Sequence, residues 1–111
     1  MDTKKFKMGW MIVAFDLPVV TKEERKLASD FRKFLLEDGF QMMQYSVYIR
    51  SLVSHARMET HIRRLKLKIP PDGAVRAIFV TESQWQHSYV VYGKSNTKHL
   101  PEELPEQLQL W

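Results

Sequence analysis

One aspartate stands where a charged side chain is costly unless it reaches solvent or a ligand. Asp16 follows the apolar run 10–15, whose length and content of Ile, Val and Phe favour a buried strand. A carboxylate at the end of such a strand emerges at the edge of the sheet. Two such carboxylates with water suit Mg²⁺, which binds one or two protein carboxylates and keeps much of its hydration shell. A purely structural turn at Asp16-Leu17-Pro18 is the alternative.

The other polar residues show few patterns typical of catalysis. The chain has no cysteine, which excludes thiolate chemistry, disulfides and zinc fingers. It contains no glycine-rich phosphate loop and no HExxH motif. The four histidines lack the spacing of metal ligands, and we expect each to be a solvated surface residue. They are His55, His61, His87 and His99.

Basic residues are concentrated in one part of the chain, which has a net charge of +4. Between Arg50 and Lys68, six basic residues stand against the single acidic Glu59. Cations in such a density suit the phosphates of duplex DNA, and binding of this kind falls steeply with salt and needs few base contacts. An ordinary solvated helix face is the alternative. The paired basic residues expected to contact nucleic acid are Arg25, Lys26, Arg63 and Arg64.

The first helix is expected between Thr21 and Gly39. Thr21 and Glu24 have the spacing of a capping box, in which each residue satisfies a free backbone N–H of the other. Gly39 suits the left-handed position that follows many helices. The apolar residues recur at helical spacing and are Leu27, Phe31, Phe34 and Leu35.

The remaining elements complete an α+β domain. The β-like stretch 40–53 loses its alternation near residue 45, which indicates two strands, 40–44 and 46–52, meeting at a bend or bulge. A second helix follows Ser54, with Met58, Ile62, Leu65 and Ile69 on its apolar face. Strands are also expected at 75–80 and, as a short extra one, at 89–92. The order is that of a two-layer ferredoxin-like βαββαβ fold with a short extra C-terminal strand.

The first strand indicates a homodimer. It shows no alternation of polar and apolar residues, so both of its faces should be buried. In a ferredoxin-like fold the helices cover only one face, and a second copy packed sheet to sheet about a two-fold axis is the simplest cover for the other. Such an axis near the strand ends would bring Asp16 beside its copy. Shielding by the helices and the tail is the alternative.

We expect one domain over residues 1–93 and a C-terminal tail over 94–111. Pro101 and Pro105 separate the end of the tail from the domain, and residues 107–111 alternate polar and apolar side chains. Leu108, Leu110 and Trp111 are the expected docking residues of a terminal strand that adds to a sheet edge of the dimer or of a partner. The apolar run 10–15 is too short for a signal sequence or a membrane span, so a cytoplasmic protein is expected.

Several segments together resemble the CRISPR-associated protein 2 family. The most specific are the strand ending in Asp16-Leu17-Pro18 and the motif Gln-x-Ser-Val-Tyr at 44–48. Segments 22–26, 31–40 and 75–76 continue the resemblance, which runs over about residues 8–93 and is closest to the branch of type II systems. Phe15 stands where the family often has tyrosine.

This resemblance implies a subunit of CRISPR adaptation. The expected homodimer bridges integrase dimers and holds protospacer duplex DNA by its backbone for spacer integration. The resemblance also implies a site for Mg²⁺ or Mn²⁺ at Asp16, because some family members are described as metal-dependent endonucleases acting on RNA or DNA and others as inactive scaffolds. The alternative is a metal-dependent endoribonuclease, or a toxin-like nuclease of the same fold, acting without an integrase. An RNA-recognition module is disfavoured because the aromatic-glycine signature is missing.

Overall fold

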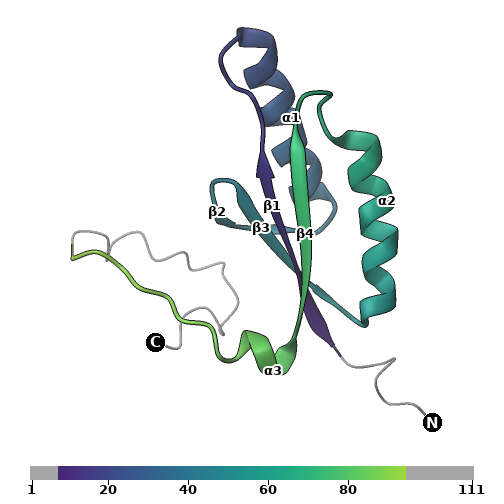
Figure 1. Cartoon of the computed structure of the whole chain (residues 1–111), viewed down its shortest axis with the longest axis vertical. Helices are drawn as coiled ribbons and strands as arrows, with labels where there is room; N and C mark the ends of the chain where they lie inside the picture. Colours follow the sequence, from purple (N-terminus) through teal and green to yellow (C-terminus); the bar gives the residue numbers. More distant parts are fainter. Residues whose placement is uncertain (1–7, 95–111) are drawn as a thin grey trace.

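The fold is an antiparallel sheet with two main helices, described over residues 8–94 by a computed structural model. The four strands lie in the order β2-β3-β1-β4 (Figure 1). This arrangement confirms the expected ferredoxin-like βαββαβ fold. The elements are β1 (Gly9–Asp16), α1 (Lys22–Glu37), β2 (Gln41–Gln44), β3 (Val47–Leu52), a 3₁₀ turn η2 (His55–Arg57), α2 (Met58–Lys68), β4 (Ala74–Thr81) and α3 (Glu82–Trp85).

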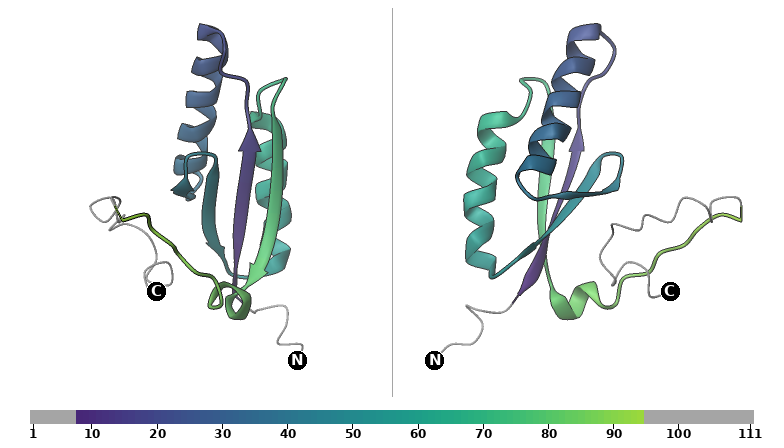
Figure 2. Two further views of the ribbon diagram at one scale, coloured as in Figure 1. Left: turned by 60° about the vertical axis from the view of Figure 1, so that its left-hand side comes forward. Right: turned by 180° about the vertical axis from the view of Figure 1, so that it is seen from behind.

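Both long helices cover the same face of the sheet (Figure 2). On that face β1 contributes Met11, Val13 and Phe15 to the main core. The helices complete this core mainly with Phe31 and Leu35 of α1 and with Met58 and Leu65 of α2, all buried. Burial of these apolar side chains, each stabilising by about 1.5–3 kcal/mol, fixes the helices on the sheet.

The two ends of α1 form as the sequence predicts. The Glu24 backbone N–H donates to Thr21 Oγ1 at 3.0 Å, and the Thr21 N–H donates to Glu24 Oε1 at 2.9 Å, which is the expected capping box. Gly39 follows the helix with φ +91°, a conformation that other residues rarely adopt. The apolar face differs by one residue, because Ala28 is buried while Leu27 is 44% exposed. The helix is rotated so that the small Ala28 permits its close approach to the sheet.

The stretch 40–53 forms two strands, as its broken alternation predicts, and they fold back on each other as a hairpin. β2 and β3 pair antiparallel and are connected by the two residues Tyr45 and Ser46. The register shifts between Met42 and Gln44, so the predicted irregularity lies within β2. Alternation along β3 makes Tyr48 face the core while Ile49 packs on the opposite side of the sheet.

The face of the sheet opposite the long helices is covered only in part by the chain itself. Trp10 packs on Trp85 of α3 with ring centroids 5.2 Å apart, and its Nε1 donates to Glu82 Oε2 at 2.6 Å. We expected a second copy of the chain, and not the chain itself, to cover this face, and at the Trp10 end that expectation was wrong. Further along, Ile12 and Ala14 are only half-buried and Ile78 is 40% exposed.

The extra strand expected at 89–92 is absent from the described residues, and this prediction was wrong. After β4 the chain enters α3 through a second capping box, formed by Thr81 and Gln84, which turns it away from the sheet (Figure 1). Val90 packs against the cluster around Trp10, while Val91 is 90% exposed. Apolar content alone suggested a strand, but within residues 8–94 this segment pairs with no strand of the sheet.

No helix within residues 8–94 combines the length and the hydropathy needed to cross a membrane.

Candidate functional site

Asp16 lies where the sequence places it, at the exposed end of β1. It is the last residue of the strand and is paired in register with Ala74 of β4. Alternation along β1 puts it on the same face as Trp10, Ile12 and Ala14, opposite the helices. Within the described residues its carboxylate has no hydrogen bond or ion pair with the protein, so it is available to a ligand.

A single chain supplies one carboxylate at this position. Among residues 8–94 no group of three or more His, Cys, Asp or Glu side chains is arranged to hold a metal ion. A lone exposed carboxylate is a weak site for Mg²⁺, whereas two of them with water satisfy its preference. The chemistry of the donor set therefore fits a metal only if Asp16 meets a second carboxylate from another molecule.

The residues behind Asp16 hold the strand end in place. The Phe15 N–H donates to the Ser46 carbonyl at 3.0 Å, which ties β1 to the β2–β3 turn. The Phe15 ring packs edge-on against Phe31, with centroids 5.2 Å apart. Burial raises the pKa of the Tyr48 phenol, an effect that the nearby Arg32 partly opposes. Burial therefore favours the protonated, uncharged phenol of Tyr48.

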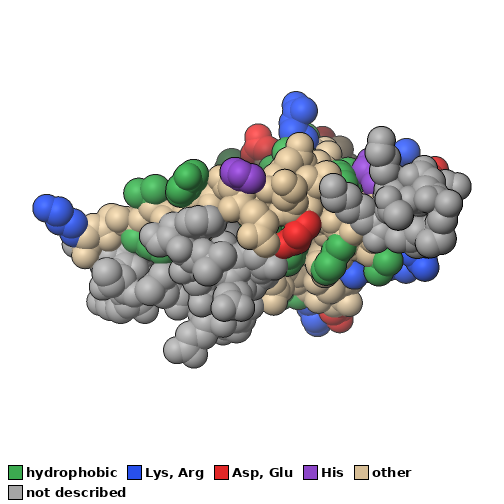
Figure 3. All heavy atoms as spheres, turned by 90° about the horizontal axis from the view of Figure 1, so that it is seen from below, with side chains coloured by type: hydrophobic (Ala, Val, Ile, Leu, Met, Phe, Trp, Pro, Cys, Tyr) green, Lys and Arg blue, Asp and Glu red, His purple; other side chains and the backbone are tan. Residues whose placement is uncertain are grey.

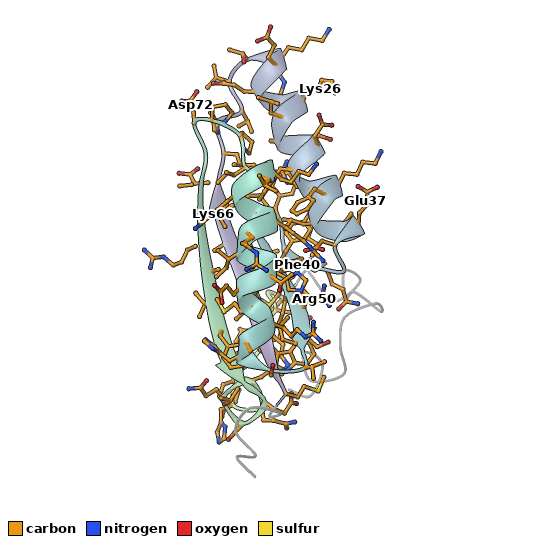
Figure 4. The ribbon with its side chains drawn as sticks, turned by 90° about the vertical axis from the view of Figure 1, so that its right-hand side faces the viewer. Lys26, Glu37, Phe40, Arg50, Lys66 and Asp72 are labelled. Atoms are coloured by element: carbon orange, nitrogen blue, oxygen red, sulfur yellow. The ribbon has the colours of Figure 1, made fainter. Side chains whose placement is uncertain are left out.

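Arg25 and Lys26 lie in the first turns of α1, toward the same end of the molecule as the end of β1 (Figures 1 and 4). Arg25 Nη1 donates to the Val20 carbonyl at 2.7 Å, and Lys26 Nζ pairs with Asp30 at 3.1 Å. Arg25 also lines a shallow cavity of about 380 Å³ together with Arg32 and Tyr45.

Arg63 and Arg64 are both exposed on α2 but have different surroundings. Arg64 Nη1 donates to Asp38 Oδ1 at 2.5 Å and lines a cavity, whereas Arg63 does not line that cavity. The four predicted basic contacts therefore belong to separate places on the two helices. A view from the α3 end shows Lys and Arg side chains at several separate positions around the outline (Figure 3).

A buried polar cluster around Asp38 was missed by sequence reasoning. The Asp38 side chain is 8% exposed and accepts from His61 Nδ1 at 2.8 Å as well as from Arg64. His61 itself is 7% exposed, so its expected position on the solvated surface was wrong. The signal lay in its spacing, because His61 stands three residues after Met58 and four before Leu65, in the apolar stripe of α2.

Arg50 completes this cluster from β3. Its Nη1 donates to the Asp38 carbonyl, its Nε donates to the Ser51 carbonyl at 3.2 Å, and its guanidinium lies 5.9 Å from the centre of the Phe40 ring. A Cβ on Gly39 would lie 2.9 Å from Arg50 Nη1, so a larger residue there would shift the end of this arginine side chain in addition to straining the backbone. Figure 4 shows Arg50 and Phe40 between α2 and the C-terminal end of α1.

We predict that Asp38→Ala lowers the free energy of unfolding by about 2–4 kcal/mol, because it leaves His61 and Arg64 without their shared acceptor. Urea denaturation followed by circular dichroism measures this change. The matched control is Asp30→Ala, which removes an exposed pair with Lys26 worth less than about 1 kcal/mol. Equal losses in the two variants would show that the Asp38 cluster does not stabilise the fold.

The expected docking residues of the tail, Leu108, Leu110 and Trp111, lie outside the described residues.

Comparison with known proteins gives consistent matches over most of the chain. The model of the family described as "CRISPR associated protein Cas2" matches residues 8–88. A "CRISPR-associated endoribonuclease Cas2" of Paracidovorax avenae is 39% identical over 106 residues, covering 96% of this chain and 96% of the relative. A protein of the same name from Parvibaculum lavamentivorans is 43% identical over 102 residues, covering 92% of this chain and 99% of the relative.

Solved structures show the same fold. The crystal structure of Streptococcus pyogenes Cas2 at pH 6.5 aligns with a TM-score of 0.59 and 24% identity, covering 76% of this chain and 99% of that one. A second structure, titled "Crystal structure of cas2", aligns with a TM-score of 0.55 and 23% identity, covering 88% of this chain and 98% of that one.

Proposed function

The chain belongs to the CRISPR-associated protein Cas2 family, and from this premise we propose that it is the small subunit of CRISPR adaptation. In this proposal a homodimer bridges integrase dimers and holds protospacer duplex DNA by its backbone during spacer integration. The observation that carries the proposal is the partly uncovered sheet face, apolar at Ile12, Ala14 and Ile78, that ends at Arg76 and Asp16.

The uncovered part of the sheet supports the homodimer. Ile12, Ala14 and Ile78 lie on this face beyond the cover that α3 gives to Trp10. An apolar surface on a small domain is stabilised when a second copy removes it from water, and a two-fold axis uses the same surface on both copies. The exposed end of β1 continues this face, so the same packing is what makes a pair of Asp16 carboxylates available.

Such a pair of Asp16 carboxylates would hold Mg²⁺ or Mn²⁺. When bound, a divalent ion of this kind polarises phosphate oxygens and lowers the pKa of bound water. The contribution of the chain is to present Asp16 from the end of a rigid strand, fixed by the hydrogen bond from Phe15 to Ser46. In the absence of an ion the two carboxylates would repel each other.

Binding of the nucleic acid is proposed to be electrostatic and independent of sequence. Arg25 and Lys26 at the start of α1 and Arg63 and Arg64 on α2 are exposed cations with side chains long enough to reach phosphates. Contacts to phosphates position a duplex without reading its bases. This mode suits a protein that handles spacers of arbitrary sequence.

We predict that the double substitution Arg25→Glu and Lys26→Glu weakens duplex binding to the same degree for unrelated sequences. It should also lower the slope of log Kd against log salt concentration by about two. Fluorescence anisotropy with two duplexes of equal length at several salt concentrations measures both effects. Glu37→Gln at the far end of α1 serves as a control for changes of surface charge on the same helix. A loss of affinity confined to one of the two sequences would contradict sequence-independent binding.

The tail is proposed to dock the integrase. Leu108, Leu110 and Trp111 alternate with polar residues, and a strand added to a sheet edge would place them in pockets while its backbone forms hydrogen bonds. We predict that deleting residues 101–111 leaves a folded dimer but abolishes co-purification with the integrase subunit. Full recovery of the integrase by the truncated protein would assign docking to the body of the domain instead.

A metal-dependent endoribonuclease acting without an integrase is the second candidate. The curated relatives that match most of the chain are named endoribonucleases, and the exposed carboxylate of Asp16 supports the same chemistry in this chain. Cleavage of single-stranded RNA by the purified protein alone distinguishes this candidate from a scaffold that needs its partner.

A further inference from the structure

We propose that the pocket between the end of β3 and α2 is a phosphate-binding site for the backbone of the bound nucleic-acid strand. This inference rests on the proposed function and gives it a location that differs from Arg25 and Lys26. The pocket is a cavity of about 630 Å³, which falls within the range of small-ligand sites, about 300–1,000 Å³. Its lining includes the side chains of Arg50, Arg57, His61 and Arg64.

The spacing of these residues makes one basic face. Arg57, His61 and Arg64 are separated by four and three positions, so they lie on the same side of the helical segment. Glu59 and Arg63 do not line the cavity. Arg50 reaches the same space from β3, on the side of the sheet that the helices cover. Three guanidinium groups, from β3, η2 and α2, therefore converge on one cavity.

Among residues 8–94, the carboxylate of Asp38 is the one that contacts the lining arginines, and it does not neutralise them. Asp38 Oδ1 accepts from Arg64 and Oδ2 accepts from His61, and the Asp38 side chain is 8% exposed. Both oxygens of this carboxylate are therefore bound by side chains of the protein itself. One carboxylate against three guanidinium groups leaves an excess of positive charge facing the cavity.

Two of the arginines are held in place before any ligand binds. Arg50 donates to the carbonyls of Asp38 and Ser51, and Arg64 donates to Asp38 Oδ1, which fixes each guanidinium while leaving other N–H groups unused. Arg57 lies in the first turn of the helical segment, where the helix dipole disfavours a cation and favours an anion. Among the described residues Arg57 has no ion pair, so its charge is left for a ligand.

The chemistry of the lining favours phosphate over other ligands. Guanidinium groups match the geometry of phosphate oxygens and bind them through paired N–H donors. A metal cation is disfavoured because the free groups are cationic donors rather than oxygen ligands. Leu52 and Val53 form the apolar part of the lining, which suits the sugar of a nucleotide beside its phosphate.

The pocket is tested by itself with inorganic pyrophosphate, added to the full-length protein while the imidazole signals of His61 are followed by NMR. Because His61 lines the cavity and is held by Asp38, we expect saturable shifts of these signals in the wild type. The double variant Arg57→Gln, Arg64→Gln should lose the shifts, whereas Lys66→Gln, Lys68→Gln should retain them. The control pair lies on the same helix, removes the same charge and does not line the cavity.

The same two variants are then compared in binding to duplex DNA by anisotropy at several salt concentrations. The pocket variant should lower the slope of log Kd against log salt concentration by about two, through the loss of two phosphate contacts, and this effect should exceed that of the control pair.

An equal effect of the two pairs on duplex binding, or no shift of the His61 signals with pyrophosphate, overturns the proposed phosphate site. If the wild type binds the duplex and only the Arg25 and Lys26 variant weakens it, the pocket fails while the proposed function stands. If pyrophosphate shifts the NMR signals of His61 but the protein binds no duplex, the proposed binding of duplex DNA is wrong. The pocket is then a site for a free phosphate compound and not for the phosphates of a nucleic-acid backbone.

Discussion

Asp16→Ala is expected to remove all metal-dependent cleavage by the purified protein while the fold and the dimer remain intact. The residue is exposed at the end of β1 and makes no hydrogen bond or ion pair within residues 8–94, so its removal leaves no buried partner unsatisfied. In the proposed dimer the same substitution removes both carboxylates from the site at once. Cleavage of labelled RNA and duplex DNA with Mg²⁺ or Mn²⁺, compared with EDTA, measures the loss.

The control for this substitution is Asp30→Ala, which removes an exposed carboxylate from α1 and should cleave at the wild-type rate. Thermal denaturation of both variants checks that the fold is retained. Cleavage by the Asp16 variant at the wild-type rate, or no cleavage by the wild type with either metal, rules out the enzyme. If spacer integration survives the substitution, Asp16 is dispensable for adaptation and the scaffold function is favoured.

The dimer is expected to dissociate when a charge is placed on the uncovered sheet face. Ile78 is 40% exposed in the single chain and lies opposite Ile12 in the β1–β4 register. In the homodimer Ile78→Glu would bury an unpaired carboxylate on each copy, which costs several kcal/mol. Light scattering at micromolar concentration should therefore give twice the 13.2 kDa chain mass for the wild type and a single chain mass for the variant.

Leu67→Glu is the matched control, because Leu67 is an apolar residue of α2 that is 83% exposed and lies away from the sheet face. This variant should remain dimeric. A wild-type mass of one chain would contradict both the homodimer and the paired Asp16 site. An Ile78→Glu variant that stays dimeric would place the interface on another surface.

Features that depend on neighbours in the sequence could be predicted without the structure. The capping box of Thr21 and Glu24, the left-handed Gly39 and the division of residues 40–53 into two strands all form as expected. Each depends on backbone chemistry within a few residues. The position of Asp16 at a strand end was equally local, because the run 10–15 ends there and Pro18 follows.

The tertiary structure alone decided which surfaces are covered and which polar groups meet. His61 is buried because Asp38, which follows α1, supplies an acceptor across the fold, and a sequence pattern does not reveal which distant residue makes that contact. The residues after β4 form α3 rather than leading to a fifth strand, and Trp85 covers Trp10. The same cluster distinguishes Arg64, which donates to Asp38, from the adjacent Arg63, which does not line the cavity. Sequence periodicity thus determined the four strands of the sheet, the two long helices and the place of Asp16 at a strand end. Packing between distant segments determined the surroundings of the basic residues and the cover of the sheet, because burial and hydrogen bonding depend on partners that are close only in space.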